Sequence, residues 1–301
     1  MLKLRPPAKI NLVLEVLRKR ADGYHDVRTV MQSIDLCDEI TIEEHPTAGH
    51  LELHTDTMRC PVDEKNLVWQ AIHWLREATG FDAGLAITMN KNIPIGGGLG
   101  GGSSDAGAVL LALVSHYGLD ISRDGLYRIA ARIGSDVSFF LVGGTALATG
   151  RGEIVNQLPD LPETAFVLAN PRIAIDTSRV YAGLGLKETK VELASTKNAC
   201  AAFLDHPHSP KRWELMKNDL QSAARRLYPR LDEVFAMLSA LGAEHPTLSG
   251  SGATVFAPVK SHDEGKELVV RLQTAGFWAA ACQSINRRQF DSCQVQQVQR
   301  I

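Results

Sequence analysis

Residues 94–104 read PIGGGLGGGSS and place six glycines within the seven positions from 96 to 102. This segment follows an apolar stretch, Gly84 to Asn90, that is typical of a strand. It precedes Asp105 to Tyr117, whose apolar residues lie three or four apart as in a helix. Successive glycines allow backbone N–H groups to turn toward one centre, and the start of the helix adds the positive end of its dipole. The segment is therefore predicted to bind a phosphate chain, whereas a plain turn needs only one or two glycines.

Three other classes of phosphate-binding protein have sequence patterns of their own. Gly96, Gly98 and Gly101 fit the GxGxxG pattern of dinucleotide-binding folds. That fold needs an acidic residue at the end of a second strand roughly 20 residues later. Here that position lies near Gly118, at the end of the predicted helix. No GK[ST] follows the glycines and the HRD and DFG sequences of protein kinases are missing. A nicotinamide oxidoreductase, a Walker-type NTPase and a protein kinase are therefore disfavoured.

Strands and helices alternate along the rest of the chain. Before the glycine segment the patterns predict strands over 10–16, 29–36, 38–44 and 50–54 and a helix over 66–79. The helix over 105–117 has Ser103 and Ser104 as candidate N-caps, and after it the patterns predict a helix over 126–134 and a β segment with glycine turns over 135–153. Beyond a proline-containing boundary at 157–162 they predict strands over 165–169, 253–258 and 278–285 and helices over 213–224, 231–241 and 264–275. This order indicates an α+β protein with domains at 1–160 and 161–301.

Composition excludes several classes of protein. The 301 residues are 45% hydrophobic and 22% charged, with 32 basic against 34 acidic residues and a net charge of -2, so the chain has no electrostatic signature of nucleic-acid or anionic-membrane binding. The longest apolar stretch, 106–114, is too short to span a bilayer, and no signal peptide is recognised. The cysteines form neither a CxxC pair nor a Cys/His cluster, which disfavours disulfides and zinc. We expect a cytoplasmic protein, in a reducing compartment.

A few other residues are candidates for chemistry, and each also has an ordinary interpretation. Lys9, in PPAKINL, begins an apolar strand and is typical of a lysine that reaches solvent at a sheet edge. Asp136, in GSDVSFF, follows a helix stop and is equally typical of a turn. Tyr24 and His25 lie beside a turn glycine. Such a pair is either exposed without a function or stacks on and hydrogen-bonds a nucleobase. Residues 248–253, LSGSGA, form a second glycine turn.

Taken together and in order, PAKINL, PIGGGLGGGSSDA and LSGSGA resemble the three motifs of the GHMP small-molecule kinases. The resemblance implies an α+β, two-domain fold with an N-terminal domain like ribosomal protein S5 and a C-terminal ferredoxin-like domain. DGYH, GSDVSFF and NDL at 218–220 are similar to the branch of the superfamily that phosphorylates a cytidine diphosphate substrate of non-mevalonate isoprenoid synthesis. A homoserine or mevalonate kinase is the alternative, but neither needs a base-binding GYH sequence. An RNA-binding module would need a basic surface.

The resemblance also implies roles for individual residues, with ATP and Mg²⁺ as the cofactors. Lys9 and Asp136 match the catalytic lysine and acid. The residues matching the ATP-phosphate loop are Pro94, Ile95, Gly96, Gly97, Gly98, Leu99, Gly100, Gly101, Gly102, Ser103 and Ser104. The residues matching substrate contacts are Asn11, Tyr24, His25 and Tyr181. The magnesium ligands are not assigned, although Ser103 and Ser104 are the nearest hydroxyls. Asp105 stands where some members carry asparagine.

Overall fold

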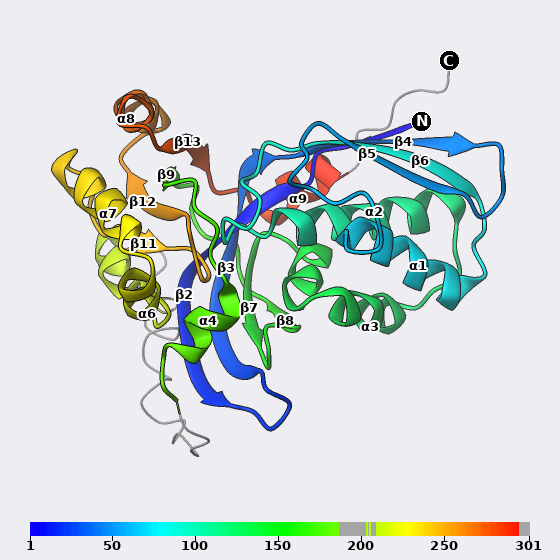
Figure 1. The fold of residues 1–301 in the computed structure, drawn as a ribbon, viewed down its shortest axis with the longest axis horizontal. Coiled ribbons are helices and arrows are strands. Elements are labelled where there is room, and N and C mark those ends of the chain that lie inside the picture. Colours follow the sequence, from blue (N-terminus) through cyan, green and yellow to red (C-terminus); the bar gives the residue numbers. More distant parts are fainter. Residues whose placement is uncertain (187–202, 204, 206–208, 295–301) are drawn as a thin grey trace.

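The computed structural model describes residues 1–186, 203, 205 and 209–294, and in this part the chain forms three β-sheets (Figure 1). The central sheet has the order β10-β2-β3-β7-β8. Its strands are β2 (Pro7–Lys19), β3 (His25–Cys37), β7 (Thr145–Thr149), β8 (Ile154–Gln157) and β10 (Lys217–Asn218). The first 10 residues of β2 are all buried, because the strand is covered on both faces. This long strand carries Lys9 and Asn11 into the middle of the molecule.

A second sheet and three helices enclose one hydrophobic core in the N-terminal half. The sheet has the order β1-β4-β6-β5. Its strands are β1 (Leu2–Leu4), β4 (Glu39–His45), β5 (Leu51–Thr55) and β6 (Gly84–Asn90). The helices are α1 (Leu67–Thr79), α2 (Gly101–Tyr117) and α3 (Arg123–Ile133), which lie together on one side of this sheet in Figure 1. Helix α1 begins where the Asn66 side chain accepts the N–H of Val68 and ends at Gly80 in the left-handed region, which matches the helix predicted over 66–79 except that Asn66 is its cap.

The third sheet and its helices form the C-terminal half, on the other side of β2 and β3 in Figure 1. The sheet order β11-β12-β9-β13 and its antiparallel pairing are those of a ferredoxin-like βαββαβ fold, which confirms the predicted fold class. Its strands are β9 (Ala165–Asn170), β11 (Thr247–Leu248), β12 (Val255–Val259) and β13 (Trp278–Gln283). The helices of this half are α4 (Thr177–Ala182), α6 (Gln221–Leu227), α7 (Arg230–Ala240), α8 (His262–Thr274) and α9 (Arg287–Gln294).

The two halves share structure across the predicted boundary. Strand β10 of the C-terminal half pairs in parallel with β2, and helix α9 returns to the N-terminal half, where the Arg5 N–H donates to the Cys293 carbonyl at 3.1 Å. The division at residue 160 stays a prediction. No helix of the described part is long and apolar enough to cross a bilayer.

Three local predictions were wrong. The helix predicted over 213–224 is instead a 3₁₀ helix (Pro210–Leu215), strand β10 and helix α6, because pairing with β2 extends the backbone at 217–218. GSDVSFF does not belong to a β segment but forms a 3₁₀ helix over Ser135–Leu141. Ser103 and Ser104 do not cap α2, which begins at Gly101 after Gly100 without a side-chain cap.

Candidate active site

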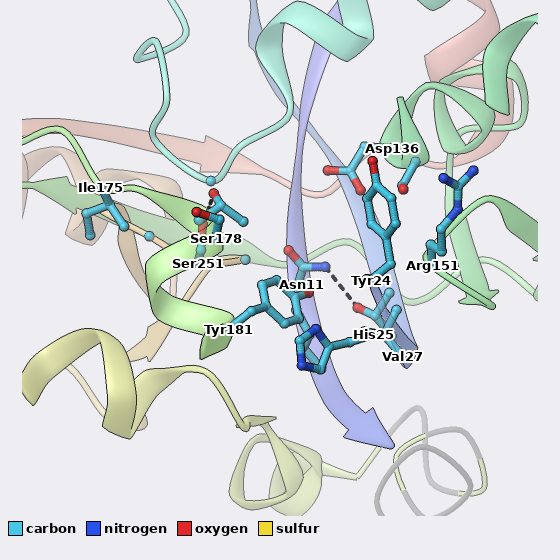
Figure 2. A pocket seen from close by; sticks show the side chains of 18 of the residues that line it. Asn11, Tyr24, His25, Val27, Asp136, Arg151, Ile175, Ser178, Tyr181 and Ser251 are labelled. Atoms are coloured by element: carbon cyan, nitrogen blue, oxygen red, sulfur yellow. Dashed lines mark hydrogen bonds between the residues drawn. The ribbon is translucent and has the colours of Figure 1, made fainter. Parts of the chain in front are cut away.

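One cavity of about 890 Å³ lies where the central sheet meets the ends of both other units. Figure 2 shows side chains from β2, β3, α4 and the 3₁₀ helix converging on it. The predicted catalytic and substrate-binding residues all line this cavity, although they come from four distant parts of the sequence. They are Lys9, Asn11, Tyr24, His25, Asp136 and Tyr181. The structure therefore places in one cavity the residues that the sequence identified separately, each from its own motif.

Lys9 is held at the centre of the cavity wall by three acceptors. Its Nζ lies 2.6 Å from Asn11 Oδ1, 3.0 Å from the Gly98 carbonyl and 3.4 Å from Asp136 Oδ2. An ammonium group has three donors, so each acceptor can take one. Lys9 is only 2% exposed, which rules out the solvent-facing sheet-edge interpretation.

The Asn11 side chain is itself oriented by a hydrogen-bond relay. Its Nδ2 donates to Thr29 Oγ1 at 2.8 Å, and that hydroxyl donates to the Val13 carbonyl at 2.7 Å. Because the hydroxyl proton of Thr29 is used on Val13, Thr29 must accept from the amide, which turns the Asn11 oxygen toward Lys9. Thr29 is a residue of this site that its sequence context did not indicate.

Asp136 projects from the first turn of the 3₁₀ helix into the cavity. Two buried aromatic residues, Phe139 and Phe140, anchor that helix in the core. The Asp136 side chain is 37% exposed, so one side faces Lys9 while the rest remains open to a ligand. A turn aspartate would instead satisfy the local backbone N–H groups, and no such bond of Asp136 is found in the described residues.

The glycine loop presents alternate residues to the cavity. Gly96, Gly98 and Gly100 have φ of +67°, +79° and +73° and line the cavity, while Leu99 between them is fully buried. The buried leucine is tied to β2, because its carbonyl accepts the Lys9 N–H at 3.0 Å. The loop is thus attached to β2 through Leu99, while its glycine backbone faces the cavity. The other residues of the predicted phosphate loop do not line this cavity.

The LSGSGA segment closes over the same loop. Ser249 Oγ donates to the Gly98 carbonyl at 2.9 Å, and the Thr254 N–H donates to the Gly97 carbonyl at 3.0 Å. The NDL sequence supports it, since Asn218 Nδ2 donates to the carbonyls of Leu248 and Gly250, both at 2.7 Å. The segment is therefore a clamp on the glycine loop and not an isolated turn.

An aromatic pair forms the opposite end of the cavity. The rings of His25 and Tyr181 lie with centroids 4.9 Å apart. Burial, with a smaller effect of Lys19, lowers the pKa of His25, so its imidazole is neutral at pH 7 and offers one donor and one acceptor. Burial and the nearby Asp136 charge raise the pKa of Tyr181. Tyr181, a substrate contact suggested by the family resemblance, thus lies beside His25. It stands on helix α4, and the sequence did not predict that helix.

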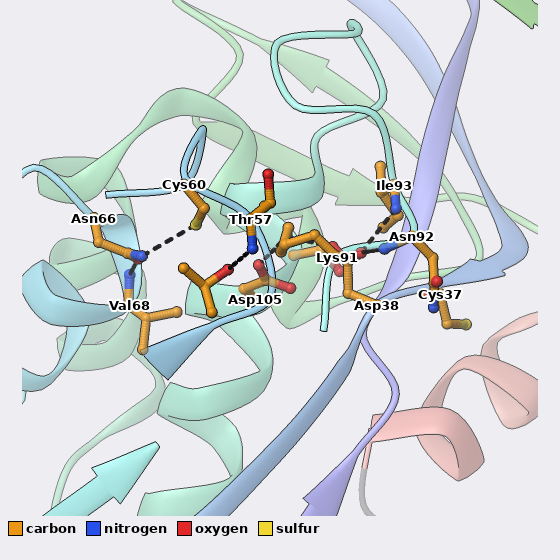
Figure 3. Close-up of polar contacts among 12 residues, drawn as sticks. Cys37, Asp38, Thr57, Cys60, Asn66, Val68, Lys91, Asn92, Ile93 and Asp105 are labelled. Carbon is orange, nitrogen blue, oxygen red and sulfur yellow. Dashed lines mark hydrogen bonds and ion pairs between the residues drawn. The ribbon is translucent and has the colours of Figure 1, made fainter. Parts of the chain in front are cut away.

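A buried ionic cluster lies outside the cavity, under the start of the glycine loop (Figure 3). Lys91 is ion-paired with Asp38 and Asp105, and all three side chains are at most 4% exposed. Asp38 Oδ1 also accepts the N–H groups of Asn92 and Ile93, at 2.6 and 2.8 Å. Asp105 therefore belongs to a structural ion pair in this protein. Neither Lys91 nor Asp38 was suggested by the sequence.

The two serines at the end of the loop differ in accessibility. Ser104 is fully buried and its hydroxyl donates to the Pro7 carbonyl at 2.7 Å, while Ser103 is partly exposed. Between these two hydroxyls, only that of Ser103 is accessible to a magnesium ion, because the Ser104 hydroxyl is buried and bonded to Pro7.

The fold and this site define a small-molecule kinase of the GHMP class. Residues 66–144 match the GHMP kinases N terminal domain and residues 209–277 match the GHMP kinases C terminal model. The chain is 38% identical to 4-diphosphocytidyl-2-C-methyl-D-erythritol kinase of Syntrophus aciditrophicus, over 94% of this chain and 98% of that one. The same kinase of Shouchella clausii is 39% identical over 85% of each chain. The chain belongs to the 4-diphosphocytidyl-2-C-methyl-D-erythritol kinase family.

Solved structures agree with this assignment. A crystal structure of 4-(cytidine 5'-diphospho)-2C-methyl-D-erythritol kinase superposes with a TM-score of 0.76 at 33% identity, covering 94% of this chain and 98% of that one. A homoserine kinase from Cytophaga hutchinsonii has a TM-score of 0.73 at 20% identity, covering 95% and 94%. The second likeness shows a shared fold alone. The protein is therefore an ATP-dependent kinase of a small molecule.

Proposed function

We propose that the enzyme transfers the γ-phosphoryl group of ATP to the 2-hydroxyl of 4-diphosphocytidyl-2-C-methyl-D-erythritol, giving ADP and the 2-phosphate in the non-mevalonate isoprenoid pathway. The observation that carries this proposal is the position of the Lys9–Asp136 pair in one cavity with the glycine loop and the His25–Tyr181 pair. ATP at the glycine loop and an acceptor whose nucleobase lies at His25 and Tyr181 would thus both reach the Lys9–Asp136 pair.

Asp136 is proposed as the group that accepts the proton of the attacking hydroxyl. As the hydroxyl oxygen bonds to the γ-phosphorus, the bond from that phosphorus to the bridging oxygen breaks and the electron pair leaves with ADP. Lys9, held by Asn11 and Gly98, lies within 3.4 Å of the carboxylate and can neutralise charge on the transferred group without reorganising. Phosphoryl transfer needs mainly such alignment and charge stabilisation.

The glycine loop is proposed to hold the phosphates of ATP through its backbone N–H groups and the start of α2. Gly96, Gly98 and Gly100 face the cavity, where side chains would take up the space of the phosphates. Mg²⁺ is proposed to enter with ATP and to supply charge neutralisation. The Ser103 hydroxyl, in the first turn of α2, is a hard oxygen donor of the kind this ion prefers.

The cytosine of the acceptor is proposed to bind at His25, Tyr181 and Tyr24. A neutral imidazole can donate one hydrogen bond and accept another, as recognition of cytosine requires. The aromatic rings supply stacking surface worth about 1 to 3 kcal/mol per base. The cytoplasmic location and the absence of nucleic-acid and membrane partners stay predictions.

The decisive experiment is a substrate comparison with purified enzyme. ADP release should require the cytidine diphosphate substrate together with ATP and Mg²⁺, and neither homoserine nor mevalonate should replace it. Asp136→Asn protein, checked for folding, serves as the inactive control. Turnover of homoserine or mevalonate at a rate equal to that of the cytidine substrate would refute the proposal.

A further inference from the structure

The turn between β7 and β8 carries an arginine into the cavity, where the motifs assign it no role. Arg151 lies between Gly150 and Gly152, whose φ angles are +70° and +110°. The Glu153 carboxylate folds back under it, accepting the Arg151 N–H at 2.6 Å and lying 3.6 Å from its Nε. A Cβ on Gly150 would come within 2.8 Å of that carboxylate. The absence of a side chain at Gly150 leaves room for the Glu153 carboxylate in this position.

The arginine packs on the ring of Tyr24. Its Cζ lies 4.8 Å from the ring centroid, within the range of a cation–π contact. The two turns that carry them are joined, because the Val27 N–H donates to the Gly150 carbonyl at 2.7 Å. Figure 2 shows the guanidinium beside the ring, with Asp136 near the end of the tyrosine.

Tyr24 needs such support more than the other aromatic groups of the site. Its residue is 54% exposed, whereas Tyr181 is largely buried against His25. The backbone below it is held locally, since Asp22 accepts the Tyr24 N–H at 3.1 Å and also pairs with Arg20. A half-exposed side chain on a fixed backbone still has free rotamers, and ordering it on binding costs affinity.

We infer that Arg151 is a positioning residue for acceptor specificity: its guanidinium, supported by Glu153, holds the Tyr24 ring at the cavity for stacking on the pyrimidine. This inference rests on the proposed function. Arg151 acts through Tyr24, so its removal weakens binding of the cytidine substrate and leaves ATP binding and the chemical step unchanged. The competing role is direct contact of the guanidinium with the diphosphate of the acceptor.

A double-mutant cycle separates the two roles. Arg151→Met, Tyr24→Leu and the double variant are compared with wild type for kcat, for both KM values and for the Kd of CDP by calorimetry. A cation–π contact at an exposed site corresponds to about a two- to fivefold effect, which is the expected rise in KM for the cytidine substrate in Arg151→Met. In the Tyr24→Leu background the same change should have no further effect.

The matched control is Arg123→Met, which removes a similar contact, 5.7 Å from the Tyr127 ring, outside the cavity lining. It should leave all kinetic constants unchanged. An equal loss from Arg151→Met in both backgrounds would overturn the inference in favour of a direct diphosphate contact. An unchanged KM for the cytidine substrate in the single variant would overturn both roles. A wild-type enzyme that neither turns over the cytidine substrate nor binds CDP would overturn the proposed function, and the inference with it.

Discussion

Gly98→Ala should disable the enzyme by separating the glycine loop from the LSGSGA segment. A Cβ at this position would lie 2.1 Å from the Ser249 carbonyl oxygen and 3.0 Å from that of Gly252. Real Cβ atoms essentially never approach a heavy atom within 3.0 Å, so the two backbones must move apart by about 1 Å. That shift acts on the carbonyl that accepts from Lys9 and Ser249. The φ of +79° adds strain.

The magnitude follows from these two effects. Left-handed backbone costs an alanine about 1 kcal/mol relative to glycine, and overpacking costs about 1 to 3 kcal/mol. We expect the free energy of unfolding to fall by about 2 to 4 kcal/mol. A displacement of about 1 Å at the catalytic pair should lower kcat/KM roughly 100-fold. Denaturant titration and initial-rate kinetics of purified protein measure the two quantities.

Gly80→Ala is the control, because it isolates the strain of a positive φ. Its φ is +70° and nothing lies within 4 Å of the added Cβ, at the C-terminal end of α1. It should lose about 1 kcal/mol of stability and keep full activity. The explanation by close contact is refuted if Gly98→Ala is no less stable than Gly80→Ala and keeps more than a third of the wild-type kcat/KM.

Three further predictions test the proposed roles. Asp136→Asn should lower kcat about 10²- to 10⁴-fold with unchanged Kd for ATP by calorimetry, and retention of a tenth of the turnover would contradict its role as base. His25→Ala should raise KM for the cytidine substrate about ten- to a hundredfold and hardly change that for ATP, so equal effects on both in steady-state kinetics would count against cytosine binding there. Burial, with the charge of Asp38, outweighs the attraction of Lys91 and raises the pKa of Asp105 from 3.8 to about 7, so its ion pair with Lys91 is complete only above that pH. Between about pH 4 and 7 the native state keeps a proton that the unfolded state releases, and the stability from this group falls as pH rises. Asp105→Asn should therefore gain stability relative to wild type over this range in denaturant melts, whereas parallel pH profiles would show that Asp105 does not titrate there.

The sequence by itself determined the local structure and the chemistry of the motifs. Six glycines between a strand and a helix are enough to predict a phosphate loop, since glycine alone adopts those φ values freely. Helix α1 and its C-terminal end were predictable because the apolar spacing and Gly80 act within a few residues of the helix. The family resemblance supplied the candidate roles of Lys9, Asp136 and His25.

Only the tertiary structure decided which residues from distant parts of the chain lie in contact. Lys9 is central to the cavity because Asn11, Gly98 and Asp136 surround it, and the last two are about 90 and 130 residues away in sequence. Strand β10 has no strand-like sequence of its own and forms because β2 offers it an edge. The Lys91 cluster and the contact of Arg151 with Tyr24 likewise depend on separate elements meeting in space. Local propensity acts over a few residues, whereas burial, ion pairing and ring contact act across the fold, so these could not be predicted from the sequence.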